Sequence, residues 1–134
     1  MHIVADSAKL LDKVPDDMNA PFKIELGPES FKSYIIDPPT RVVEVNKNML
    51  IHMYHEMVKM RRMEVAADQA YKHKLVRGFC HLAIGQEAVS VGMQNAINPD
   101  DNVITAYRCH TFAVQRGGSM HGLFAELFGA CNAD

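Results

Sequence analysis

The chain is organised around the stretch Arg77-Gly78-Phe79-Cys80-His81-Leu82-Ala83-Ile84-Gly85-Gln86-Glu87-Ala88. This stretch lies between two segments with helical periodicity and gathers two glycines, an aromatic ring, a thiol, an imidazole and a carboxylate in one short connection. Connections held by a rigid scaffold are where binding and catalytic residues concentrate. A second dense stretch follows, Ile104-Thr105-Ala106-Tyr107-Arg108-Cys109-His110. We expect the remainder of the chain to hold these two stretches side by side.

The composition is that of an ordinary globular chain, with 134 residues of which 48% are hydrophobic and 22% charged. The formal net charge of -2 argues against a nucleic-acid partner bound through phosphate neutralisation. No apolar run reaches the roughly 18 residues that predict a membrane-spanning helix, so no membrane partner is expected. Residues 1–13 contain two lysines, two aspartates and no arginine, which matches neither a signal peptide nor a mitochondrial targeting segment.

The three cysteines are an odd number without framework spacing, which predicts free thiols rather than a disulfide scaffold. Two of them stand beside histidines, in Cys80-His81 and Cys109-His110, so a zinc site has to be weighed. Adjacent residues of an extended chain point to opposite faces, and the spacing usual for structural zinc is missing. A zinc-binding module is therefore the least favoured hypothesis.

Residues 1–45 are predicted to form an extended N-terminal arm. Prolines recur between residues 15 and 39, so no long helix fits there. Residues 22–26 alternate apolar and polar side chains, which predicts a short strand, and residues 42–45 are predicted as a second extended piece. The apolar residues at 31–36 are too many for a free tail. We therefore expect the arm to lie on another surface, such as that of a partner subunit.

A long helix is predicted from about Lys47 to about His73, with Asn46 or Asn48 as its N-cap. Glu64 interrupts the apolar face of this helix, so one polar contact is expected within that face. Core packing is the favoured interpretation of its methionines, and a promiscuous binding surface is the minor one. Local ion pairs are expected among Arg61, Arg62 and Glu64. The apolar face consists of Leu50, Met53, Met57, Met60, Ala67 and Tyr71.

The second half of the chain is predicted to be α/β. A helix starts near Gly85, an apolar strand of buried type covers residues 102–106, and a further helix is capped by Ser119 and stopped by Gly129. In α/β architecture, ligands gather at the carboxyl ends of strands. We predict that residues 46–134 are the opening helices and first strand of an incomplete α/β domain, so that the fold is α/β, helix-rich and preceded by the arm.

Polar side chains near these predicted ends suit a small anionic ligand. The planar fork of Arg108 can bind a carboxylate or phosphate bidentately, the alternative being a structural ion pair. His81 and His110 titrate near neutrality and can donate to an anion, although a lone histidine is more often structural. Tyr107 and Glu87 have ordinary explanations, as a half-buried ring and as a carboxylate favoured by a helix N-terminus. The reaction does not follow from these residues alone.

Over roughly residues 20–129 the chain resembles the α subunits of pyruvate dehydrogenase E1 components. The extended motif Arg-Gly-Phe-Cys-His-Leu at 77–82 is specific to them, and it favours pyruvate over branched-chain oxoacids as substrate. The resemblance is carried by residues 51–54, 61–64, 71–72, 77–82, 85–88, 104–110 and 125–127.

The resemblance implies a thiamine-diphosphate-binding fold and an α2β2 heterotetramer with the E1 β subunit in the mitochondrial matrix. It implies oxidative decarboxylation of pyruvate, with the acetyl group passed to the lipoyl domains of the E2 component. The implied cofactors are thiamine diphosphate and Mg. The Gly-Asp-Gly motif that holds Mg in the family does not occur in this chain, so no Mg ligand is named.

The resemblance also implies the site residues. His81, Phe79 and Arg108 would bind the substrate, and Tyr107 and Arg108 would contact the cofactor. No catalytic residue is assigned, because in this family the glutamate that activates the thiamine ring comes from the β subunit and is not Glu87. Thr111 stands where the family usually has glycine.

Two hypotheses share all these motifs. In the first, the chain is a partial α subunit of an active enzyme, and the 134 residues alone neither bind thiamine diphosphate tightly nor decarboxylate pyruvate. In the second, it is a catalytically inactive short chain that acts as an interaction protein on the surface of the β subunit. The intact mass of the natural polypeptide would separate them.

Overall fold

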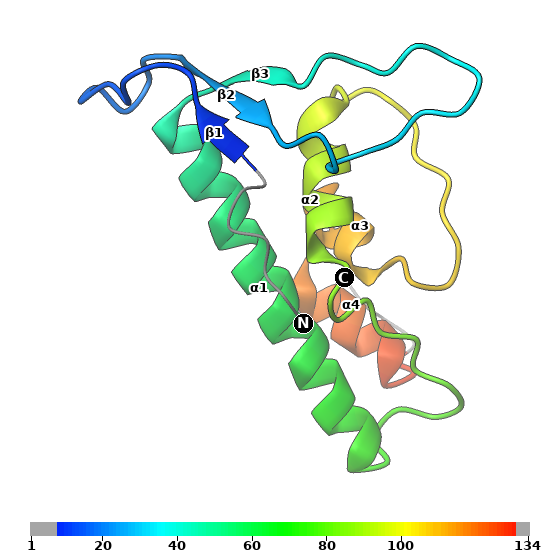
Figure 1. Ribbon diagram of the computed structural model, residues 1–134. Helices are drawn as coiled ribbons and strands as arrows, with labels where there is room; N and C mark the ends of the chain where they lie inside the picture. The colour runs from blue at the N-terminus through cyan, green and yellow to red at the C-terminus, as the bar shows by residue number, and fades with distance from the viewer. Residues whose placement is uncertain (1–7, 131–134) are drawn as a thin grey trace. The chain divides into compact units, whose positions relative to one another are not determined.

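The computed structural model describes residues 8–130, which form three β-strands followed by four α-helices (Figure 1). These residues divide into two compact units between His52 and Met53. This division falls within the first helix, so the predicted organisation into an arm (1–45) and the opening of an α/β domain (46–134) stays a prediction. The strands are β1 (Ala8–Leu10), β2 (Phe22–Leu26) and β3 (Val42–Val45), and the helices are α1 (Lys47–Lys72), α2 (Glu87–Ala96), α3 (His110–Gln115) and α4 (Met120–Leu127).

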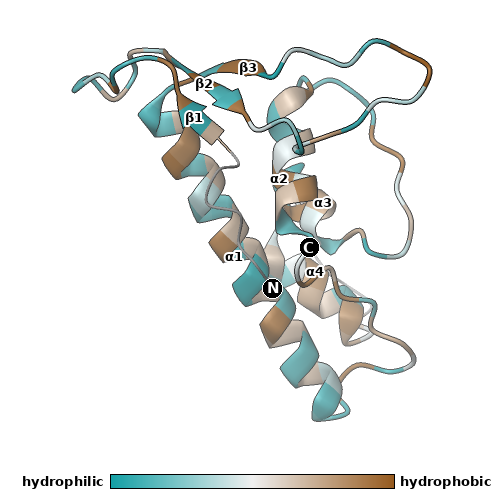
Figure 2. Ribbon diagram, in the orientation of Figure 1, coloured by the Kyte–Doolittle hydropathy of each residue, from teal (hydrophilic) through white to brown (hydrophobic). Residues whose placement is uncertain are grey.

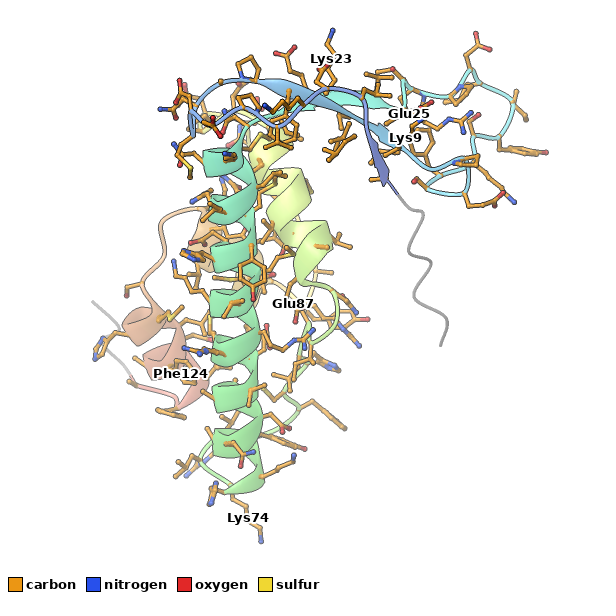
Figure 3. The ribbon with its side chains drawn as sticks, turned by 60° about the vertical axis from the view of Figure 1, so that its left-hand side comes forward. Lys9, Lys23, Glu25, Lys74, Glu87 and Phe124 are labelled. Atoms are coloured by element: carbon orange, nitrogen blue, oxygen red, sulfur yellow. The ribbon has the colours of Figure 1, made fainter. Side chains whose placement is uncertain are left out.

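The first unit is built on an antiparallel sheet with strand order β1-β2-β3. The strands predicted at residues 22–26 and 42–45 are confirmed, and they pair with Phe22 opposite Val45, both buried. Lys9 lies opposite Glu25 (Figure 3). Lys23 lies opposite Glu44, so unlike charges face each other at both positions of the ladder. Such cross-strand pairs contribute about 0.2–1 kcal/mol each and help to fix the register.

The long helix α1 begins as predicted. The Asn46 side-chain oxygen accepts a hydrogen bond from the Met49 amide at 2.8 Å, which satisfies one of the free amides at the helix start. Asn48, the alternative cap, instead donates from its side chain to the side-chain oxygen of Asn19 at 2.6 Å. The helix ends at Lys72, one residue before the predicted end.

The second unit packs α1, α2, α3 and α4 around one apolar cluster (Figure 2). The core interpretation of the methionines is confirmed for Met60 and Met63, whose exposed fractions are 0% and 4%. Leu50 and Tyr71, predicted on the same face, are instead exposed. Partly buried side chains complete the cluster, whose members are Met60, Met63, Val91, Val114, Met53, Met57, Met120, Leu123 and Phe124.

The strand predicted at residues 102–106 is wrong for this structure. These residues are irregular, and Ile104 is 99% exposed. A strand needs a neighbouring strand for its amides and carbonyls, and within residues 8–130 all the strands lie in the N-terminal sheet. The described chain is therefore a mixture of helices and a small antiparallel sheet.

Helix ends in the second unit follow local signals. The Ser119 hydroxyl accepts a hydrogen bond from the Gly122 amide at 2.9 Å, and Gly129 has φ +75 just beyond α4, so both predicted ends are confirmed. The short helix α3 was not predicted, and it starts without a side-chain cap. No helix within the described part of the chain has the length and apolar character needed to cross a membrane.

Candidate functional site

Two irregular connections carry the candidate site. The first connection, residues 73–86, joins α1 to α2, and the second connection, residues 97–109, joins α2 to α3. Both belong to the second unit. The first connection contains Gly78 with φ +76 and Gly85 with φ +88, which are backbone conformations that favour glycine. These glycines let the chain turn sharply on either side of Phe79 and His81.

The structure brings together all four residues predicted to bind substrate or cofactor. The His81 ring meets the Tyr107 ring edge-on, with 4.7 Å between their centroids, and the Phe79 ring stacks beside His81 at 5.9 Å. The Arg108 guanidinium lies over the Tyr107 ring, 5.2 Å from its centroid, which is within cation–π range. Two aromatic rings, an imidazole and a guanidinium from separate connections therefore form one cluster.

This cluster is open to ligands. Phe79 is 86% exposed and Tyr107 is 65% exposed. Arg108 is partly buried, and its Nε is buried without a hydrogen-bond partner among residues 8–130. An unpaired buried donor on a guanidinium is costly unless it receives an acceptor, and a carboxylate or phosphate oxygen fits that need. The geometry thus suits an anionic ligand with an apolar part against Phe79.

The first connection is fixed to α1 by a charged contact. Arg61 Nε and Nη2 donate to the two carboxylate oxygens of Glu87 at 2.5 and 2.8 Å, and the Gly85 amide donates to Glu87 at 3.0 Å. These donors lower the pKa of Glu87 to about 2, against the opposing effect of burial. Figure 3 shows Glu87 beside α1. The helix dipole therefore does not fully explain the carboxylate at the start of α2, because Glu87 also anchors the first connection to Arg61 of α1.

The local ion pairs predicted along α1 are wrong for Arg61 and Glu64. Arg61 pairs with Glu87, and Glu64 turns inward, where it is 0% exposed. Helical spacing places these side chains near one another on the helix surface, but tertiary partners compete for them. These charged side chains of α1 therefore make tertiary contacts and do not pair with each other along the helix surface.

Glu64 meets His110 inside the second unit. Their carboxylate oxygen and Nδ1 are 3.4 Å apart, and His110 is 8% exposed. The contact lies within ion-pair distance but outside hydrogen-bond geometry, and both Glu64 oxygens are buried without a hydrogen-bond partner in the described residues. Glu64 raises the pKa of His110, although burial acts in the opposite direction. The polar contact expected within the apolar face is confirmed, while its partner could not be read from the sequence.

Neither thiol described by the structure sits in a metal-binding cluster. Within residues 8–130 no group of at least three His, Cys, Asp or Glu is arranged to hold a metal ion. Cys80 is partly buried, and burial followed by the nearby Glu64 carboxylate raises the pKa of its thiol. Cys109 is exposed and free, and Cys131 lies outside the described residues. Thr111 is 1% exposed at the start of α3.

A separate groove of about 640 Å³ runs along α1 beside α4. Its lining includes Tyr54, Met63 and Phe124, and it contains none of the four clustered residues. The groove is mostly apolar, whereas the cluster offers the guanidinium and imidazole that an anion requires. Chemistry, and not volume, therefore selects the cluster as the candidate site.

Comparison with known proteins identifies the family of the chain. The dehydrogenase E1 component family matches residues 55–134, which include both connections. The chain belongs to the dehydrogenase E1 component family. The match starts within α1 and covers every residue of the candidate site, so the predicted resemblance is confirmed at the level of the family.

Individual relatives carry the name pyruvate dehydrogenase E1 component subunit alpha, mitochondrial. The protein of Chaetomium thermophilum is 52% identical over 116 residues, and that of Saccharomyces cerevisiae is 49% identical over 119 residues. Each match covers 87% of this chain but 28% of the relative. The Solanum tuberosum protein is 54% identical over 99 residues, covering 74% of the chain and 25% of the relative. The chain therefore spans about a quarter of the length of these relatives.

Proposed function

We propose that this chain is part of a pyruvate dehydrogenase E1 α subunit and carries one wall of its substrate and cofactor site. The reaction is oxidative decarboxylation of pyruvate with transfer of the acetyl group to the lipoyl domains of E2. One observation carries the proposal: Phe79, His81, Tyr107 and Arg108 form a single exposed cluster in a chain about half identical to proteins of that name.

The wider setting is part of the same proposal. The chain would contribute to a thiamine-diphosphate-binding fold in an α2β2 heterotetramer with E1 β, in the mitochondrial matrix. The word mitochondrial in the names of the relatives supports the compartment. The predicted strand at 102–106 gives this fold no support, so the support comes from the family match and from the helices that hold the site.

Each clustered side chain has a role that its geometry allows. Arg108 binds an anionic group through its planar guanidinium, whose Nε has no hydrogen-bond partner among the described residues. The Tyr107 ring lies against the guanidinium of Arg108 and restricts the position of that group through a cation–π contact. His81, held edge-on against Tyr107, donates a hydrogen bond to a substrate carboxylate. Phe79 covers the apolar part of the substrate and excludes water.

The residues present fit the anionic end of thiamine diphosphate. When bound, this cofactor supplies the electron sink that a 2-oxo acid needs to lose carbon dioxide. Tyr107 and Arg108 would contact its diphosphate, and Arg108 would share its charge with the substrate carboxylate. Because no three-residue metal cluster occurs among residues 8–130, none of the described residues is proposed as a Mg ligand.

The test uses the natural protein assembled with the E1 β subunit, with pyruvate-dependent reduction of an artificial electron acceptor as the readout. Arg108→Gln is expected to lower kcat/KM for pyruvate on the order of 100-fold, since it removes a charge-assisted bidentate contact. Arg108→Lys keeps the charge without the fork and should recover only part of the activity. The matched control is Arg62→Gln, an exposed arginine on α1. Activity unchanged in Arg108→Gln would overturn the assignment of the site.

One observation favours the alternative, an inactive chain that acts as an interaction protein on the β subunit. In the first unit, Tyr34, Ile35 and Ile36 are 86%, 87% and 74% exposed, and Ile35 has φ +69. Three consecutive exposed apolar side chains on a strained backbone are typical of a contact surface. Stable binding to E1 β combined with no pyruvate-dependent turnover by the natural protein would favour this alternative.

A further inference from the structure

One carboxylate of α1 is buried beside the end of the second connection. Glu64 is 3.4 Å from His110, which starts α3 directly after the second connection. Glu64 also acts on the Cys80 thiol, which stands between Phe79 and His81 in the first connection. Helix α1 therefore contacts the end of each connection, through Arg61 with Glu87 and through Glu64 with His110.

Regular structure does not explain how the two connections keep their arrangement. The site residues of both connections lie outside the helices and strands of the described chain. The Arg61–Glu87 contact anchors the end of the first connection, but it does not reach the second. Arg61 and Glu64 both lie on α1, so the Glu64–His110 pair fixes the end of the second connection to the helix that anchors the first. A buried carboxylate in an apolar helix face is costly, and a positioning role would explain its presence.

We propose that Glu64 and His110 are positioning residues, and that their buried pair holds Tyr107 and Arg108 against His81. Glu64 holds His110, which sets the start of α3 and hence the direction of Arg108. Neither residue touches the ligand. The inference rests on the proposed function for its activity readout, and on a separate chemical readout for the pairing itself.

The pair works in its charged form. Protonated His110 and ionised Glu64 attract one another in a region of low dielectric constant. Because the folded protein raises the pKa of His110, the attraction is complete below the ordinary value and is lost as pH rises through the raised one. Charged or titratable groups on the surrounding elements are Glu126 and His121 on α4, Glu87 on α2, Asp68 on α1, Cys80 on the first connection, and Arg108 on the second.

These neighbours do not replace Glu64 as the partner of His110. Glu126 acts in the same direction as Glu64 but contributes less, and Glu87 is already held by Arg61. Loss of the His110 proton therefore weakens the pair itself. A merely stabilising pair would change the melting temperature without changing the pH profile of catalysis. A positioning pair changes both.

The experiment again uses the natural protein assembled with E1 β, and it compares Glu64→Gln, His110→Gln and the double variant. The matched control is Glu56→Gln, which removes a carboxylate from the same helix at the solvated Lys59 contact. The first readout is kcat/KM for pyruvate as a function of pH. The second is alkylation of Cys80 by iodoacetamide, measured by mass spectrometry and normalised to the exposed Cys109 of the same molecule.

We expect kcat/KM to fall on the order of 10- to 100-fold in each single variant, since small misplacements of a binding group have effects of that size. Wild type and Glu56→Gln should lose activity as pH rises through the His110 pKa, and His110→Gln should lack that decrease. Glu64→Gln should also raise the Cys80/Cys109 alkylation ratio, because removal of the carboxylate lowers the pKa of the Cys80 thiol.

The outcomes separate the two proposals. A wild-type protein without pyruvate-dependent turnover overturns the proposed function, and the alkylation ratio then judges the pairing alone. Wild-type kcat/KM in Glu64→Gln, or an unchanged alkylation ratio in that variant, overturns the positioning role. If Glu64→Gln does not fold, the double variant and the wild-type pH profile decide, since the double variant buries no unpaired charge and the profile needs no substitution. A wild-type kcat/KM that does not decrease as pH rises also overturns the positioning role of the pair.

Discussion

Two buried carboxylates of the second unit, those of Glu87 and Glu64, have opposite hydrogen-bonding environments. Glu87 receives two N–H groups from Arg61 and one from the Gly85 amide, and its partner is 49% exposed. Glu64 has no hydrogen-bond partner among residues 8–130 and faces a histidine at 3.4 Å. The first carboxylate is fully satisfied by permanent donors, whereas the second depends on a group that titrates near neutrality.

This difference separates a fixed anchor from an adjustable one. The donors around Glu87 hold its pKa at about 2, so the Arg61–Glu87 contact keeps its charge throughout the physiological range. The Glu64–His110 pair changes its charge where His110 titrates. The Arg61–Glu87 contact at the end of the first connection therefore keeps its strength between pH 6 and 8. The Glu64–His110 contact at the end of the second connection changes its strength as His110 titrates.

The largest effect on stability is expected from removing one partner of the Glu64–His110 pair and leaving the other buried. His110→Leu leaves the Glu64 carboxylate buried without its partner, and such half-broken pairs cost about 3–5 kcal/mol. The variant Glu64→Leu/His110→Leu removes both charges and should recover most of that loss. Denaturant unfolding of the purified protein measures both. Equal stability of wild type and His110→Leu would show that the two side chains are not coupled.

Glu87→Gln should have a smaller effect, about 1–2 kcal/mol, because the lost charge-assisted contacts have a largely exposed partner. The pH dependence sharpens the comparison. A carboxylate whose pKa is lowered stabilises the fold above its unfolded value, and that stability is lost as pH falls toward about 2. Thermal melts of wild type and Glu87→Gln should therefore differ by a constant amount from pH 6 to 8, and the difference should shrink progressively as pH falls from about 4 toward about 2. A difference that vanished between pH 6 and 8 would contradict this assignment.

Local signals in the sequence predicted the ends and faces of helices. The methionine periodicity identified α1, and Asn46, Ser119 and Gly129 marked helix ends through side chains and backbone conformations that act within a few residues. Helix α3 escaped prediction because it is short, and because Cys109, the residue before its first turn, provides no side-chain cap. The strand predicted at 102–106 failed because an apolar run becomes a strand only beside another strand, and the described residues offer it none.

The candidate site could be predicted in part. Phe79, His81, Tyr107 and Arg108 stand out as dense stretches and through the family resemblance, and the structure places them within contact distance. The sequence also showed that Glu64 needed a polar partner. It could not show that the partner is His110, or that Arg61 reaches Glu87, because each of these contacts joins residues far apart in the chain. Long-range pairing is decided by tertiary packing, which leaves no local pattern.

The smallest effect is expected at a contact that belongs to neither carboxylate. Ser119→Ala removes the hydroxyl that accepts from the Gly122 amide, at the start of the helix that contributes Leu123 and Phe124 to the core. Loss of such a cap costs about 1 kcal/mol. Because no ionisable group takes part, the decrease in unfolding free energy should be the same at pH 6 and pH 8. A pH-dependent decrease would mean that the start of α4 is coupled to the titration of His110. The Glu64–His110 pair would then affect the stability of α4 as well as the arrangement of the two connections.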